Sequence, residues 1–343
     1  MAFTSRFIAR GIAAHDSATP MQWLLAVAGA VREVEPTLVV PCDEVALRLL
    51  FEFVRNPPPA FRGSAGSALR ELVRRSLGDP EHYETSVDKS ALPAAAQALG
   101  VPVPPFAVAR SIAEAAAHAE RLGFPVIVKR RFGFASQGVA VVHRTDELPD
   151  AARSLLQPMQ IDLGMPVEPR LLVQSFIDGR TCSQTMVAWE GTCLAGFARE
   201  REVTFAQGKG ATAVVRLRRN ASIRESTERL CRGFGISGFL SVEFIAPVAG
   251  GPPLLLEINR RLETMTHLDE FAGVDMCGAL YARLAGVPNA SPQDMSAADP
   301  GIIATFPREW LRDPDSRWLR DHPCDVPWDD PALIEALVAL RNE

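Results

Sequence analysis

Two glutamates occupy matching positions on two neighbouring predicted strands. Glu243 lies within an apolar strand at residues 239–245, and Glu257 lies within a second at residues 254–259. Alternate residues of a strand face the same side of a sheet. If the hairpin closes symmetrically about Gly250, Glu243 lies directly opposite Glu257, with the Cβ atoms about 5 Å apart. The sequence therefore predicts two carboxylates held close together.

Such a carboxylate pair needs a positive group between its members. Two unit charges about 5 Å apart repel by roughly 3 kcal/mol at an effective dielectric constant of about 20. Mg2+ is the natural partner because it prefers carboxylate and phosphate oxygens. The same register places Asn259 opposite Ser241, where its amide oxygen can add a ligand, and Arg261 projects beside the metal toward a phosphate. The alternative is that both glutamates face solvent on an exposed sheet.

Two lysines lie upstream of these acids. Lys129 ends a buried apolar strand at residues 125–129, so its ammonium group emerges at the strand terminus. Lys89 follows Asp88 in a polar gap within a helical stretch. Ammonium groups in such places can bind phosphate. The alternatives are a lysine that extends to solvent at a strand end, for Lys129, and an ordinary surface lysine, for Lys89.

The composition excludes several classes of protein. The formal net charge of -5 is spread through 343 residues, so there is no basic stripe for a nucleic acid. No apolar run reaches the ~18 residues that span a bilayer, and the N-terminus shows no secretory signal. The six cysteines form no CxxC pair, which argues against zinc and disulfides. We expect a cytoplasmic protein without nucleic-acid or membrane partners.

Hydrophobic periodicity places the remaining elements in an α+β order. Strands at 125–129 and 139–142 form a hairpin with a long tip, and strands at 183–190 and 193–204 form a second that turns at Glu190-Gly191. Another strand is predicted at 171–174. Helices are predicted at 21–35, 44–54, 68–100 with a polar gap, 109–123, 145–156, 221–234 and 275–284.

The first 84 residues indicate only part of an α/β layer. A short strand is predicted at Leu38-Val39-Val40, between helices at 21–35 and 44–54. Such a layer normally begins with a strand and a glycine-rich turn, and the residues before 21 supply neither. We therefore expect this first domain to be abbreviated or incomplete.

The hairpin that carries the two glutamates resembles the metal-binding end of the ATP-grasp superfamily, of the carboxylate–amine ligase type and similar to the ATP-binding domains of carbamoyl phosphate synthetase large subunits. The motifs are GISGFLSVEF at 235–244 and LLEINRR at 255–261. The resemblance implies that Glu243, Glu257 and Asn259 bind two Mg2+ (or Mn2+) ions and that Arg261 stabilises the transferring phosphoryl group. The family's proline is replaced here by Arg260.

The same resemblance assigns the upstream residues to ATP. Lys129 and Lys89 match the two family lysines that reach the phosphates. The segment RRFGFASQG at 130–138 stands where the family has a flexible flap over the phosphates, although a plain hairpin tip is the alternative. Within this flap, the residues expected to contact ATP are Ser136, Gln137 and Gly138.

The segment LVQSFIDG at 172–179 resembles the family's linker between the two ATP-clamping lobes. Gln174 stands at a position that is acidic in the family, and Thr181 stands where an acid often binds the ribose. The amide oxygen of Gln174 can still accept from the adenine amino group. The residues expected to line the nucleoside are Gln174, Ser175, Phe176, Ile177 and Asp178.

The expected protein is an ATP-dependent ligase with an ATP-grasp fold, in which two α+β lobes clamp ATP. By resemblance, Arg199 holds the carboxylate substrate or its acyl phosphate. The alternatives are phosphorylation of bicarbonate and a non-catalytic ATP-binding module. Small-molecule carboxylate and amine substrates, and a homodimer, are the expected partners. The domains are expected at 1–84 (first domain), 85–108 (connector), 109–173 (small lobe), 174–300 (large lobe) and 301–343 (extension).

Overall fold

The computed structural model describes residues 4–13, 19–133, 138–159, 161, 163, 168–206, 209–287, 293–294 and 301–340. The chain divides into two compact units. The larger comprises Thr37–Ala198 and Arg219–Ala297, and the smaller comprises Met1–Pro36, Arg199–Arg218 and Ala298–Glu343. The domain boundaries expected from the sequence remain predictions. No helix among the described residues combines the length and apolar character needed to cross a bilayer.

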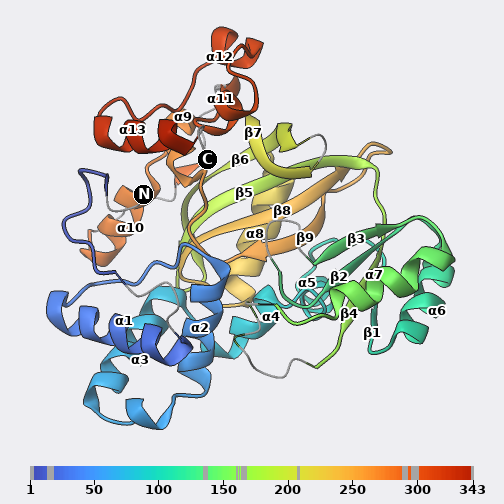
Figure 1. Cartoon of the computed structure of the whole chain (residues 1–343), viewed down its shortest axis with the longest axis horizontal. Helices are drawn as coiled ribbons and strands as arrows, with labels where there is room; N and C mark the ends of the chain where they lie inside the picture. Colours follow the sequence, from blue (N-terminus) through green and yellow to red (C-terminus); the bar gives the residue numbers. More distant parts are fainter. Residues whose placement is uncertain are drawn as a thin grey trace. The chain divides into compact units, whose positions relative to one another are not determined.

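The larger unit contains a small lobe built on a four-stranded antiparallel sheet with the order β1-β4-β2-β3. Helices α6 and α7 pack against this sheet (Figure 1). Alanines on α6 and valines on β2 and β4 are fully buried between them, which explains why an alanine-rich helix is stable here. The elements are β1 (Phe106–Ala109), α6 (Ile112–Leu122), β2 (Val126–Arg130), β3 (Val139–Val142), α7 (Leu148–Leu155) and β4 (Leu171–Ser175).

The predicted hairpin of 125–129 and 139–142 is confirmed, but β1 was not predicted. We expected a helix to begin at residue 109, whereas Ala109 ends β1 and the helix starts at Ile112. The four residues of β1 follow a proline-rich stretch and are too short to show a period. Their strand conformation depends on pairing with β4, from Phe106 opposite Gln174 to Ala109 opposite Leu171.

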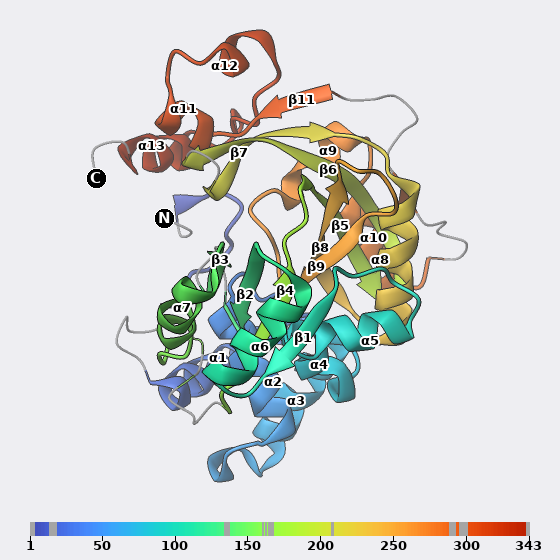
Figure 2. The same cartoon turned by 90° about the vertical axis from the view of Figure 1, so that its right-hand side faces the viewer.

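The large lobe of the same unit is built on β5, β8 and β9, which are paired antiparallel. Helices α5 and α8 bury one face of these strands (Figure 2). The predicted turn at Glu190-Gly191 is confirmed, with both residues at positive φ of 47° and 78°. The elements are α5 (Leu92–Ala98), β5 (Gly179–Trp189), α8 (Ala221–Gly233), β8 (Gly238–Pro247), β9 (Leu254–Asn259), α9 (Asp269–Ala272), α10 (Met276–Leu284) and β10 (Gln293–Asp294).

The predicted strand at residues 38–40 is wrong. No described residue before Phe106 lies in a strand, so the described part of the first 84 residues forms no α/β layer. The backbone N–H of Val39 donates to Ser76 Oγ at 2.9 Å, a side-chain partner that replaces a neighbouring strand. Helices follow instead, at α2 (Glu44–Arg55), α3 (Ser64–Leu77) and α4 (Tyr83–Val87), with short 3-10 turns at Pro59–Phe61 and Pro80–His82.

The smaller unit joins the two ends of the chain. Ser5 Oγ donates to Asp330 at 2.5 Å, and Arg6 pairs with Asp329 at 3.2 Å. Strand β6 (Thr192–Ala206) contributes its second part to this unit, where it pairs with β7. The other elements are α1 (Pro20–Val34), β7 (Lys209–Leu217), β11 (Gly301–Ala304), α11 (Arg308–Arg312), α12 (Arg317–Asp321) and α13 (Pro331–Ala339).

Candidate active site

The predicted strand register of the two glutamates is confirmed. Glu243 on β8 lies opposite Glu257 on β9, and Ser241 lies opposite Asn259. Beyond Glu243 a bulge shifts the register, so that Phe244 pairs with Leu255. Val242 and Ile258, which alternate with these residues along the two strands, belong to the buried core. Both glutamates therefore point to the face of the sheet opposite that core.

A lysine ammonium neutralises one of these carboxylates. Lys89, between α4 and α5, forms an ion pair with Glu257 and is only 7% exposed. Burial alone would raise the pKa of Glu257, but the charges of Lys89 and Lys129, with a hydrogen bond from Asn259, hold that pKa below its ordinary value. Glu257 is therefore ionised at neutral pH, as a metal ligand must be.

Lys129 is the second cation near this pair. It is buried in β2, one residue before the strand ends at Arg130, whereas the sequence predicted a strand that ends at Lys129 with its ammonium group emerging. Burial, with the positive charge of Lys89, lowers its pKa from 10.5 to about 8, while Glu257 and Glu243 partly offset this effect. Two lysines and two glutamates thus interact electrostatically in one region of the larger unit.

The donor set near Glu257 fits Mg2+. Carboxylate oxygens from Glu243 and Glu257, with the amide oxygen of Asn259, are the hard ligands that Mg2+ accepts alongside phosphate oxygens and water. Within the described part of the chain, no three His, Cys, Asp or Glu side chains gather into a metal-binding group. A bound Mg2+ would therefore need ligands from a nucleotide or water to complete its shell, as Mg2+ commonly does.

The loop that carries Lys89 is tied to the root of the predicted flap. The backbone N–H of Lys89 donates to the carbonyl of Arg131 at 2.9 Å. The guanidinium of Arg131 in turn donates to Asp88 Oδ2 at 2.9 Å and to Glu84 at 2.6 Å. Asp88 is 1% exposed, so this ion pair is buried. These contacts fix Lys89 relative to the strand that ends at Lys129.

Of the flap residues expected to contact phosphate, Ser136 and Gln137 lie outside the described residues. Gly138 is described and has a positive φ of 83°. Its carbonyl accepts a hydrogen bond from Arg130 N at 2.9 Å, closing the base of the hairpin. A Cβ at this position would lie 2.4 Å from Arg130 Cδ. Glycine is therefore required by both conformation and space, and the phosphate contact remains a prediction.

The predicted nucleoside residues follow one another along β4 and beyond it. Gln174 is 2% exposed, and its Nε2 has no hydrogen-bond partner among the described residues. A buried donor of this kind is costly unless a ligand satisfies it, and ring nitrogens of a nucleotide base are acceptors. Ser175 N and Phe176 N are already bonded to the carbonyls of Pro105 and Pro125.

The remaining linker residues are more open. Phe176 is 44% exposed, and Asp178 is also exposed. The carbonyl of Asp178 accepts from Val248 N at 2.9 Å, which joins the linker to the end of β8. Ile177 is partly buried between them. The contacts of these residues with a nucleoside remain predictions.

The structure places Arg261 beside an acid that the sequence did not indicate. Arg261 Nε donates to Glu44 Oε1 at 2.9 Å, and Nη1 donates to the carbonyl of Leu262 at 3.4 Å. Glu44 is 9% exposed, and burial raises its pKa although Arg261 acts in the opposite direction. A signal for Glu44 is weak in the sequence, because a glutamate in the first turn of a helix is common.

Arg260 stands where the family has a proline, and its side chain has a structural role. It is 1% exposed, and its guanidinium donates to Ser86 Oγ at 3.0 Å and to the carbonyl of Leu77. Burial lowers its pKa to about 10. The guanidinium also lies 5.2 and 5.4 Å from the ring centroids of Phe51 and Tyr83. It thereby ties the end of β9 to the helices before it.

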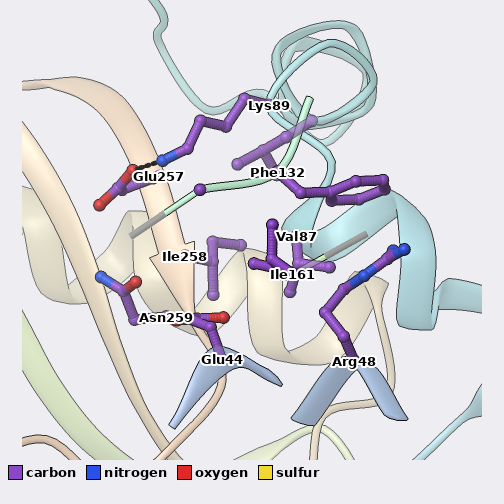
Figure 3. Close-up of a pocket in the computed structure, with 11 residues that line it drawn as sticks. Glu44, Arg48, Val87, Lys89, Phe132, Ile161, Glu257, Ile258 and Asn259 are labelled. Carbon is purple, nitrogen blue, oxygen red and sulfur yellow. Dashed lines mark hydrogen bonds and ion pairs between the residues drawn. The ribbon is translucent and has the colours of Figure 1, made fainter. Parts of the chain in front are cut away.

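Lys89, Glu257 and Asn259 line a pocket, whereas Glu243 and Lys129 are not part of its lining (Figure 3). In that view Lys89 points toward Glu257, while Glu44 and Asn259 lie on the opposite side. The guanidinium of Arg48 lies 3.5 Å from the ring centroid of Phe132, at the root of the flap. The lining consists of Glu44, Arg48, Val87, Lys89, Leu92, Phe132, Gly133, Ile161, Glu257, Ile258 and Asn259.

Arg199 belongs to the smaller unit. It is buried on β6, where its register partner is Leu217 on β7. Its role toward a carboxylate substrate therefore remains a prediction from the resemblance.

Comparison with known proteins identifies the family. The model described as carbamoyl-phosphate synthase L chain, ATP binding domain, matches residues 88–286. The carbamoyl phosphate synthase large chain of Beutenbergia cavernae is 28% identical over 238 residues, which is 66% of this chain and 21% of that protein. The counterpart from Rubrobacter xylanophilus is 28% identical over 219 residues, 60% of this chain and 20% of that protein. The chain thus spans about a fifth of these relatives.

Solved structures with similar folds include two biotin carboxylases. A biotin carboxylase in complex with β-γ-ATP from Campylobacter jejuni gives a TM-score of 0.60 at 16% identity and covers 77% of this chain and 58% of that one. The biotin carboxylase domain dimer of Hydrogenobacter thermophilus 2-oxoglutarate carboxylase, with MgADP and bicarbonate, gives 0.62 at 15% identity, covering 79% and 59%. The fold is therefore the ATP-grasp fold, and because the family model covers more than half of its residues, the chain belongs to the family of carbamoyl-phosphate synthase L chain ATP-binding domains.

Proposed function

We propose that this chain is a Mg-ATP-dependent ligase that phosphorylates a carboxylate to an acyl phosphate and couples it to an amine, with release of ADP and phosphate. The observation that carries the proposal is the opposition of Glu243 and Glu257 across β8 and β9, with the charges of Lys89 and Lys129 acting on both. This combination provides acids for a metal and cations for phosphates.

The residues of the site would act mainly by positioning charge. Lys129 and Lys89 would bind the phosphates, while Glu243, Glu257 and Asn259 would hold Mg2+, which neutralises phosphate charge when bound. Gln174, with its unsatisfied amide, would bind the nucleotide base. Phosphoryl transfer between aligned substrates needs no enzyme nucleophile.

The ion pair between Lys89 and Glu257 is compatible with this function. An ammonium that now balances Glu257 can turn to a phosphate once Mg2+ takes its place beside the carboxylate. Lys89 is buried and Glu257 is partly buried, and an uncompensated buried charge is costly, so metal and nucleotide are expected to bind together.

The test is ADP release measured with Mg-ATP across a panel of carboxylates, with and without amines. Glu257→Gln should lower the rate of ADP release by at least about a hundredfold, because it removes a charged metal ligand. Glu225→Gln is a matched control, since Glu225 lies on the exposed surface of α8 with a side chain 67% exposed. Undiminished ADP release by Glu257→Gln would refute the metal assignment.

Bicarbonate is a second candidate for the carboxylate. The relatives are carbamoyl phosphate synthases by name, and one structure with the same fold holds bicarbonate. Release of ADP that depends on bicarbonate alone would favour this substrate. Protection by Mg-ATP against heat, without ADP release from any mixture, would instead indicate a non-catalytic module. The homodimer expected from the sequence is tested by light scattering on the purified chain.

A further inference from the structure

The first helix of the larger unit extends the site beyond the segment that matches the family. Helix α2 places Glu44 and Arg48 on the pocket wall, together with Lys89, Glu257 and Asn259 (Figure 3). The family match begins only at residue 88. Glu44 and Arg48 lie one helical turn apart. Both therefore reach the pocket from a part of the chain that the family match does not include.

The carboxylate of Glu44 is held by one oxygen only. Oε1 accepts from Arg261 Nε at 2.9 Å, and no described residue forms a hydrogen bond with Oε2. The side chain is 9% exposed, so little solvent replaces the missing partner. A largely buried carboxylate with one oxygen fixed and the other without a hydrogen bond, on a residue that lines the pocket, has the arrangement of an oriented proton acceptor.

The helix that carries Glu44 and the segment that follows Arg261 are both held in place by hydrogen bonds. Asp43 caps the helix by accepting from Ala46 N at 2.7 Å, which sets Glu44 in the first turn. The backbone N–H of Leu262 donates to the carbonyl of Pro41 at 2.9 Å, which holds the segment after Arg261 against the start of α2. Arg261 is therefore an orienting partner of Glu44.

We propose that Glu44 is the general base that accepts the proton of the amine substrate. The proposal rests on the proposed function. The amine nitrogen forms the new C–N bond with the acyl carbon, the C–O bond to phosphate breaks, and phosphate leaves with the electron pair. The proton lost by the nitrogen passes to Glu44 Oε2. Phosphorylation of the carboxylate requires no such acceptor and precedes this step.

The test separates the two half-reactions. Wild-type chain and Glu44→Gln are incubated with Mg-ATP and the carboxylate that supports ADP release. Ammonium chloride is the amine in one set, and hydroxylamine is the amine in the other. Hydroxylamine is weakly basic, reacts as the neutral species and needs no enzyme base, so it reports acyl phosphate as a hydroxamate. Glutamine keeps the acceptor for Arg261 Nε but cannot take a proton.

Glu44→Gln should lose about a hundredfold in amide formation while hydroxamate formation and ADP release with hydroxylamine stay near wild type. Glu52→Gln, on the same helix and bonded to Asn56, is the matched control and should change neither product. Equal loss of both products, or loss of neither, would overturn the proposal. A wild-type chain that forms neither product would refute the proposed function, and this inference with it.

Discussion

Replacing Lys129 with methionine should make the protein more stable at neutral pH. Lys129 is 6% exposed, and burial lowers its pKa from 10.5 to about 8. That difference corresponds to roughly 3 kcal/mol of unfolding free energy, because one pKa unit is about 1.4 kcal/mol. Methionine is similar in length and carries no charge, so the Lys129→Met variant should gain up to about 3 kcal/mol at pH 7.

The pH dependence gives this prediction its sign. Between pH 8 and 10.5 the unfolded chain retains the proton of Lys129 that the folded chain has released, so the wild type becomes more stable as pH rises through this window. The advantage of Lys129→Met should therefore be full below pH 8 and should disappear near pH 10.5. Urea unfolding followed by tryptophan fluorescence at a series of pH values measures both free energies.

Replacing Lys89 with methionine should change the unfolding free energy in the opposite direction. Burial acts to lower its pKa, but Glu257, Glu44 and Glu243 together raise the pKa above 10.5. Its stabilising contribution is therefore present below pH 10.5 and is lost as pH rises through the folded-state pKa. Lys89→Met should destabilise the chain at pH 7 by up to about 3 kcal/mol, because it removes the buried partner of the partly exposed Glu257. If Lys129→Met were also destabilising at pH 7, or if its effect did not vary with pH, the electrostatic reasoning would be refuted.

Two further predictions concern the parts that hold the site together. Arg260→Ala should lower the unfolding free energy by about 3 kcal/mol in urea titrations, because Ser86 and the carbonyl of Leu77 lose a buried charged donor. A change below about 0.5 kcal/mol would show that these hydrogen bonds do not stabilise the fold. Gly138→Ala should cost more stability than Gly250→Ala, because both glycines have positive φ but only Gly138 would bring a Cβ against Arg130; equal losses, each about 1 kcal/mol, would mean that the crowding is relieved.

Local periodicity was sufficient where the partner strand is a neighbour in sequence. The register of Glu243 against Glu257 follows from a short turn between two strands, so counting residues from Gly250 predicts it. The position of Lys129 near the end of β2 follows in the same way from one apolar run and the hairpin with β3. The positions of the residues proposed to bind metal and phosphate on β8, β9 and β2 were therefore predictable before the fold was known.

Contacts between residues that are distant in sequence were not identifiable. The apolar run at 38–40 and the residues of β1 are both short, yet only β1 becomes a strand, because β4 pairs with it. The ion pairs of Lys89 with Glu257 and of Arg261 with Glu44 join residues 168 and 217 positions apart. No local pattern encodes such pairs, since each depends on packing of several elements.

The residues predicted from the sequence and those found only in the structure lie in different parts of the chain. The residues proposed to bind metal and phosphate lie within residues 88–286, the segment shared with the family, whereas Glu44 and Arg48 line the pocket from outside that segment. Fold and nucleotide chemistry are commonly shared among relatives, while the substrate is set by groups grafted onto the fold. Identification of the amine and carboxylate should therefore begin with variants of α2 rather than with the motifs of β8 and β9.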